Sequence, residues 1–506
     1  MAASLRHPLS GLVWLAMAVI YLPILPAGAM LLAPAFSLTN WQRLLNDPQL
    51  PQAAVATLVS TLIATLGALF IALLLVSLLW PGKRWRRLTT RLPWLLAIPH
   101  VAFATGALLL FAEGGLFYQV CTVCSPPFDR YGVGLGLTLA VKESAFVLWA
   151  IYAVLPEKRL AQQKIVLQTL GYGRFQTLSW LILPAIAPVL GAVMLAVLAW
   201  SLSVVDVAIV LGPGNPPTLA WQWLSQGDAQ QQAKGTLLCL LLLLLLAALA
   251  ALGYGLWKAW VRTLADLTGT RPRSQRVLPE RALSGFLPAC GVLCAAVLLM
   301  LAQRDDVGPV GTSLSFGLLS ALIALVVGLL WLEWGPQRGT LWVWLPLALP
   351  ALPLVTGQYA IALHLGIDGH YAAVLWSHLL WVLPWMLLVL QPAWRRIDPR
   401  LILTARTLGW RRTKIFLLLK CPLLVRPALL AFATGFSVSM AQYMPTLWLG
   451  AGHFATLTTE TVALSSGGSI PILANRALGL LLVTGTVFGL AALLSRLVGC
   501  YRQGLR

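Results

Sequence analysis

Ionisable side chains are scarce in this chain, so those that fall inside apolar stretches are the first candidates for chemistry. Lys142 and Glu143 are neighbours in such a stretch, and Asp206 lies late in another. Ionisable groups inside a membrane are costly and usually face a cavity or a partner; at the outer surface they would instead extend towards water. Both interpretations stay open. The residues expected to line a polar pathway are Lys142, Glu143, Ser201, Asp206, Ser439, Gln442 and Tyr443.

No catalytic centre is indicated elsewhere. The chain has no GxxxxGK[ST] phosphate loop, and its closest fragment, residues 81–84, lacks both the first glycine and the Ser/Thr. No Ser/His/Asp or paired-carboxylate arrangement suggests hydrolysis. His364, Asp368 and His370 share a short segment that is more typical of a solvated loop than of a metal site. We therefore expect a protein that is not an enzyme and that holds no metal or cofactor of its own.

The cysteines are too few for a disulfide framework, with 7 in 506 residues. Cys121 and Cys124 form a CxxC in a segment expected outside the cytoplasm. An oxidising compartment permits a disulfide there. The pair is predicted to be either a local disulfide or two inert thiols.

Composition places these residues in a membrane. The chain is 59% hydrophobic and only 10% charged, with a mean hydropathy of +0.84, whereas soluble domains are about 25% charged. A spanning helix needs about 20 apolar residues. The sequence predicts an all-α membrane protein of about twelve spans, six in each half, with prolines interrupting the spans near residues 100 and 350. The expected spans are 12–36, 54–80, 92–112, 134–155, 181–211, 236–260, 282–302, 312–334, 342–364, 371–391, 421–449 and 471–498.

The distribution of basic residues predicts the orientation. With the N-terminus in the cytoplasm, most of the 35 Lys and Arg residues fall on the cytoplasmic side, as the positive-inside rule requires. Both termini are therefore expected in the cytoplasm. The first apolar stretch is longer than the core of a signal peptide and is expected to remain as a span. Because the +20 charge is divided among short loops between spans, nucleic-acid binding is not expected.

A motif that occurs twice suggests how the spans are organised. Residues 168–184 and 406–422 both contain Thr-Leu-Gly, a basic or aromatic stretch, and a hydrophobic run that ends in proline. The offset between the two copies, nearly half the chain, also aligns Ser201 with Ser439. The sequence therefore predicts two tandem copies of one large unit. Because each copy has an even number of spans, the two copies have the same orientation in the membrane. The predicted division is a first domain at 1–260, a cytoplasmic linker at 261–281 and a second domain at 282–506.

Each motif is predicted to form a cytoplasmic elbow between the fourth and fifth spans of its half. In the first copy, a helix from Glu157 to Leu170 should break at Gly171 and continue as a second helix into the membrane. Glycine permits the left-handed conformation that such a turn needs. The elbow segments are 156–184 and 393–422. An elbow joined rigidly to a span would act as a lever.

These motifs resemble the coupling loop of the membrane subunits of binding-protein-dependent ABC importers. The pattern there is Glu-Ala-Ala-x3-Gly-x9-Ile-x-Leu-Pro. The first copy has Ile165-Val166-Leu167 at the head, and the second has Leu403-Thr404-Ala405, so the acidic residue and its salt bridge are lost in both. Two such domains in one chain are similar to the fused iron(III)- and thiamine-type permeases. The resemblance implies two parallel six-helix domains of the MetI-like permease type.

The resemblance also implies partners and a location. The chain would be the translocation subunit in a bacterial inner membrane, with ATP and magnesium bound by two copies of a separate ATPase subunit. A periplasmic binding protein would deliver the solute. The alternative is a twelve-span secondary carrier coupled to protons or sodium, which should show inverted repeats within each half and deep acidic residues. The residues that would contact the ATPases are Thr169, Leu170, Gly171, Pro184, Thr407, Leu408, Gly409 and Pro422.

Overall fold

The computed structural model describes a helical bundle. It covers residues 8–112, 115–121, 129, 131–155, 157–212, 216–226, 228–266, 280–303, 308–336 and 340–501. In these ranges nine helices are long and apolar enough to cross a membrane, and three bent helix pairs bring the number of candidate spans to twelve. The predicted all-α membrane fold is confirmed.

The first half contains the elements up to α14. They are α1 (Pro8–Tyr21), α2 (Ile24–Leu32), α3 (Leu38–Leu45), α4 (Leu50–Leu79), α5 (Lys83–Ala97), α6 (His100–Phe111), α7 (Leu116–Val120), α8 (Val133–Val154), α9 (Glu157–Thr169), α10 (Arg174–Thr177), α11 (Leu183–Ser203), α12 (Asp206–Leu211), α13 (Pro216–Ser225) and α14 (Ala229–Asp266).

The second half contains the elements from α15 onwards. Its elements are α15 (Glu280–Leu301), α16 (Val310–Trp334), α17 (Leu345–Ala348), α18 (Ala351–Leu365), α19 (Tyr371–Arg395), α20 (Pro399–Thr407), α21 (Arg412–Ile415), α22 (Cys421–Leu423), α23 (Val425–Met440), α24 (Met444–Leu449), α25 (Leu457–Ser465) and α26 (Ile470–Tyr501). The predicted linker 261–281 is helical at both ends, and its residues 267–279 lie outside the described part of the chain.

Prolines bend two spans where the sequence predicted interruptions. Helices α5 and α6 meet at 91° around Pro99, and the segment Leu341–Ala348 meets α18 at 107° around Pro350. Proline has no N–H to donate to the preceding turn, so a helix kinks or ends there. A third bend, of 77°, separates Arg412–Leu423 from α23 and was not predicted. Pro427, in the first turn of α23, leaves one further backbone bond unmade at this bend.

The predicted fifth span of each half was too long. Helix α11 ends at Ser203, Val204 is extended, and a separate helix α12 begins at Asp206. In the second half α23 ends at Met440, and α24 begins only at Met444. Adjacent β-branched valines at 204 and 205 favour extended backbone. Because they are as apolar as the span itself, hydropathy does not reveal the break.

The first span of each half packs on the other half. Helix α1 contacts α16 and α19, α2 contacts α18, and α15 contacts α4, α5 and α6. The Tyr21 hydroxyl donates to the Val343 carbonyl at 2.8 Å, and the Trp376 indole donates to the Val19 carbonyl at 2.9 Å. The halves are therefore interlocked by their first spans.

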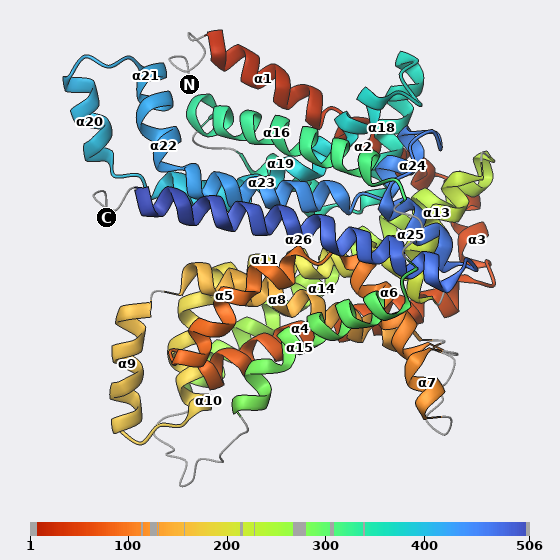
Figure 1. Ribbon diagram of the computed structural model, residues 1–506. Coiled ribbons are helices and arrows are strands. Elements are labelled where there is room, and N and C mark those ends of the chain that lie inside the picture. The colour runs from red at the N-terminus through yellow and green to blue at the C-terminus, as the bar shows by residue number, and fades with distance from the viewer. Residues whose placement is uncertain are drawn as a thin grey trace.

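Both elbow helices project from the same end of the bundle. Figure 1 shows α9 and α20 at the end where α1 begins and α26 finishes, while α3, α7 and α13 lie at the opposite end. We call these the elbow end and the far end.

The close approach of α2 and α18 gives a first prediction. A Cβ at Gly357 would lie 2.7 Å from the Pro23 carbonyl oxygen, whereas a Cβ at Gly28 would meet nothing within 4 Å. We expect Gly357→Ala to lower the free energy of unfolding by about 1–3 kcal/mol through overpacking. Denaturation of the purified chain in mixed micelles measures it. Gly28→Ala is the matched control, and equal stability of the two variants would contradict the packing.

Candidate functional site

The two elbows have the same backbone turn. Gly171 has φ of 83° and Gly409 has φ of 78°, in the left-handed region that residues with a Cβ rarely adopt. The Tyr172 N–H then donates to the Leu167 carbonyl, and the Trp410 N–H to the Ala405 carbonyl, both at 3.0 Å. This 6→1 bond is that of a Schellman motif. The helix–Gly–helix geometry expected from the sequence is present in both copies.

The residues before each glycine also correspond. The hydroxyls of Thr169 and Thr407 each donate to a carbonyl three residues earlier, at 2.8 Å. Leu170 is 49% exposed and Leu408 is 69% exposed. Each elbow therefore presents an apolar side chain to the surroundings at its tip.

The prolines that end the motifs follow a π-helical turn. Leu178–Ile182 and Phe416–Lys420 are π segments at equivalent positions of the two copies, and Pro184 and Pro422 each occupy the second position of the following α-helix. A π turn makes i→i+5 bonds, and a proline leaves its own bond to the preceding turn unmade. Because the π turn is wider than an α turn, the helix continues past the proline although proline has no N–H to donate. The first elbow therefore continues into α11 as one helix, whereas the second reaches α23 through the 77° bend after Leu423.

A cation of the first elbow reaches the end of the second span. Lys164 on α9 is buried and donates to the carbonyl of Trp80, directly after α4. Its ammonium also lies 5.5 Å from the Trp80 ring centre. The attachment combines a hydrogen bond with a cation–π contact.

The second elbow is attached at the corresponding place by an ion-pair cluster. Glu333, near the end of α16, is 5% exposed and accepts a 2.7 Å hydrogen bond from Arg412 Nε. Lys420 Nζ contacts the other carboxylate oxygen. A buried carboxylate is stable only when it is paired. Both elbows are thus held to the second span of their own half, by different chemistry.

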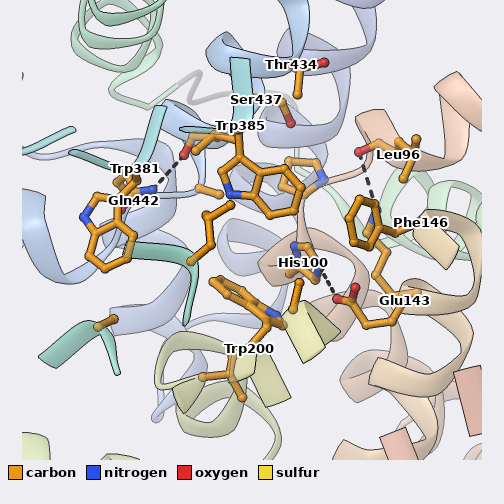
Figure 2. A pocket seen from close by; sticks show the side chains of 18 of the residues that line it. Leu96, His100, Glu143, Phe146, Trp200, Trp381, Trp385, Thr434, Ser437 and Gln442 are labelled. Carbon is orange, nitrogen blue, oxygen red and sulfur yellow. Dashed lines mark hydrogen bonds and ion pairs between the residues drawn. The ribbon is translucent and has the colours of Figure 1, made fainter. Parts of the chain in front are cut away.

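A cavity of about 230 Å³ lies between the two halves. The bent spans contribute to its wall, together with α8, α11 and α12 from the first half and α19, α23, α24 and α26 from the second. Figure 2 shows His100, Glu143 and Trp200 on one side and Trp381, Trp385 and Gln442 on the other. Five of the seven predicted pathway residues line this cavity: Lys142, Glu143, Asp206, Gln442 and Tyr443.

The charged groups of the lining are mostly paired. His100 Nε2 lies 2.7 Å from Glu143 Oε1, as Figure 2 shows. Lys142 Nζ donates to the Leu95 carbonyl at 2.8 Å, at the end of α5. Asp206 is 7% exposed, and within the described residues its carboxylate has no ion pair and no side-chain hydrogen-bond partner. Asp206 is therefore the acidic side chain of the lining that has no ion pair among the described residues.

Ser201 and Ser439 do not line the cavity. Both are buried, at 3% exposure. Ser439 Oγ lies 2.8 Å from His378 Nδ1, and His378 Nε2 lies 2.9 Å from Thr446 Oγ1, so this group ties α19 to α23 and α24. The equivalent of His378 in the first half is Ala140, and the Ser201 hydroxyl is buried without a hydrogen bond. Ser439 is therefore hydrogen-bonded between helices and does not line the cavity.

The aromatic wall was missed by the sequence reasoning. Trp149, Trp200, Trp381 and Trp385 line the cavity together with Phe146. The indole nitrogens of Trp200 and Trp381 are buried without a hydrogen-bond partner. Tryptophan is enriched at membrane interfaces, so tryptophans in the middle of predicted spans were the available signal.

The structure describes only one of the two cysteines of the predicted CxxC pair. Cys121 is disulfide-bonded, while Cys124 lies outside the described residues. Within the described ranges, no three His, Cys, Asp or Glu side chains are grouped so as to hold a metal ion.

Comparison with known proteins identifies a full-length relative. The chain is 61% identical over 511 residues to the inner membrane ABC transporter permease protein YnjC of Escherichia coli (strain K12), and the match covers 100% of both chains. No protein-family model matches the chain.

The Glu333 cluster gives a second prediction. Glu333→Gln leaves Arg412 and Lys420 without their carboxylate, so we expect the free energy of unfolding to fall by about 1–3 kcal/mol. Combining it with Arg412→Gln should cost less than the sum of the two single changes. Asp368→Asn, in a loop at the far end, is the control for loss of one carboxylate. Full additivity in mixed-micelle denaturation would show that the two groups do not interact.

Proposed function

Because the chain belongs to the family of inner-membrane ABC transporter permeases, we propose that it is the translocation subunit of an ATP-driven importer of the MetI-like type. The observation that carries this proposal is the duplicated elbow. It occurs with the same glycine turn and the same π turn in both halves, at one end of the bundle, and each copy continues into a span that lines the central cavity.

The geometry supports a lever mechanism. The first elbow runs without a break into α11, the second joins α23 at the 77° bend, and both of these helices line the cavity. A force on the elbow would therefore move the wall against which a solute lies. Two elbows fit two copies of a partner ATPase, which would bind ATP and magnesium and draw the elbows together. Opening and closing of the cavity would follow the ATPase cycle.

We also propose an orientation in the membrane and a set of partners. The elbow end, with both chain termini, would face the cytoplasm, and a periplasmic binding protein would deliver the solute to the far end. The six-span domains would be 1–260 and 282–506, joined by the linker 261–281. ATP hydrolysis would take place on the partner chains. The secondary-carrier alternative is not favoured, because the full-length relative is an ABC transporter permease.

Native mass spectrometry after purification in mild detergent tests the assembly, and glycine variants test the lever. Two copies of one ATPase chain per permease are expected. A β-branched residue in a left-handed conformation costs about 1–2 kcal/mol, so Gly171→Val and Gly409→Val should deflect the elbows and abolish transport while membrane insertion stays normal. Gly253→Val, at an open position in α14, is the control.

Two results would contradict the lever. The first is normal transport by both glycine variants. The second is a chain that stays alone across detergents and stimulates no ATPase, which would redirect attention to an ion-coupled carrier and to Glu143.

The heads of the two motifs suggest how the ATPase is held. Ile165 and Leu403 occupy the position of the family's glutamate, and they are 60% and 64% exposed. Both copies therefore offer an apolar side chain where the family offers a charge. The partner groove would be apolar at this point, so that contact area replaces the salt bridge.

Restoring the acid tests this idea. Ile165→Glu combined with Leu403→Glu should weaken ATPase binding by about tenfold or more, because a charge would be placed against an apolar surface. Co-purification at increasing detergent concentration and titration of the ATPase measure the effect. Leu38→Glu, on the exposed surface of the far end, should leave binding unchanged. Tighter binding of the double variant would show that the partner retains the ancestral basic contact.

A further inference from the structure

The Lys, His, Asp and Glu side chains of the cavity lining all come from one half of the chain. At the offset that aligns Gly171 with Gly409, Lys142 corresponds to Leu380, Glu143 to Trp381 and Asp206 to Met444. Aligning the two proline bends places His100 opposite Ala351. A solute in the cavity therefore meets acidic and basic side chains on the wall of the first half, and aromatic, apolar and uncharged polar side chains on the wall of the second.

One carboxylate of the charged wall lacks an ion-pair partner among the described residues. Lys142 is held by the carbonyl of Leu95, and Glu143 by His100. The carboxylate without an ion pair is that of Asp206, which is 7% exposed. A buried carboxylate without a counter-ion is costly, and a cationic ligand would relieve that cost.

Aromatic rings lie beside this carboxylate. The Trp200 ring lies 5.2 Å from the His100 ring, and Asp206 interacts electrostatically with both His100 and Tyr443. Trp381 lines the same cavity from the second half. The faces of Trp and Tyr rings attract cations, most strongly where water is excluded.

We propose that the solute recognised in this cavity is a small organic cation, whose positive group lies against Asp206 and the rings of Trp200 and Tyr443. This inference rests on the proposed transport function. A bare metal ion fits less well, because in the described part of the chain no three His, Cys, Asp or Glu side chains form a ligand group. An anion fits less well, because the one lysine is already held by backbone carbonyls.

A matched pair of probes separates charge from shape. Choline and 3,3-dimethylbutan-1-ol have the same shape, but only choline is charged. Binding of each to the full-length chain in lipid nanodiscs is measured by tryptophan fluorescence and calorimetry. We expect choline to bind about tenfold more tightly or better, from cation–π and carboxylate contacts. Equal binding of the two probes, or no binding of choline, would overturn the proposal.

Variants of the cavity residues show which side chains cause the preference for the charged probe. Asp206→Asn should abolish it, and Asp206→Glu should retain it. Asp228→Asn, an exposed carboxylate outside the cavity, should leave it unchanged. Trp200→Leu should weaken choline binding more than binding of the neutral probe, which keeps the test open if Asp206→Asn does not fold. A preference for choline that survives in Asp206→Asn would contradict the assignment.

ATPase capture distinguishes this proposal from the transport function. If the unmodified chain fails to capture an ATPase, the importer assignment is wrong whatever the probes do. If capture is normal in the unmodified chain and in Asp206→Asn, but the probes bind equally, only the cation assignment is wrong.

Discussion

The left-handed turn at Gly171 and Gly409 is the constraint on which the rest of the arrangement depends. It reverses the chain after the elbow helix and lets the next N–H close a 6→1 bond onto that helix. The chain then passes through the π turn and becomes a wall of the cavity. Because Arg174–Ser203 is one continuous helix in the first half, and a single residue separates α22 from α23 at the bend of the second, a displacement at either elbow would be passed to the cavity wall.

The attachments behind the elbows show that one mechanical role can be met by different chemistry. Lys164 uses a backbone carbonyl and an indole ring, whereas Glu333 needs two cations to offset the cost of its burial. The place is the same in both halves, at the end of the second span. What the duplication has preserved is the position of the attachment, while the side chains that make it have diverged.

The parts of the structure that could be predicted are those with local causes. Composition indicated twelve spans, Pro99 and Pro350 indicated the bends, and the spacing from glycine to proline indicated the elbows. The tryptophans of the cavity wall were visible in the middle of predicted spans, but a helix that is apolar on every face does not reveal which of its faces lines a cavity. The packing of each first span on the other half depends on contacts such as that of Tyr21 with Val343. These contacts join residues far apart in the chain, so they leave no local signal in the sequence.

The unequal walls of the cavity follow from having both halves in one chain. A solute on the axis of two identical subunits would meet every side chain twice, so a carboxylate on one side would face a carboxylate on the other. Here the position of Glu143 is occupied by Trp381 in the second half, and that of Asp206 by Met444. The fused chain can therefore place charge on one side of a solute and aromatic, apolar and uncharged polar side chains on the other. Such a cavity orients an asymmetric solute, which a strictly symmetric one cannot do.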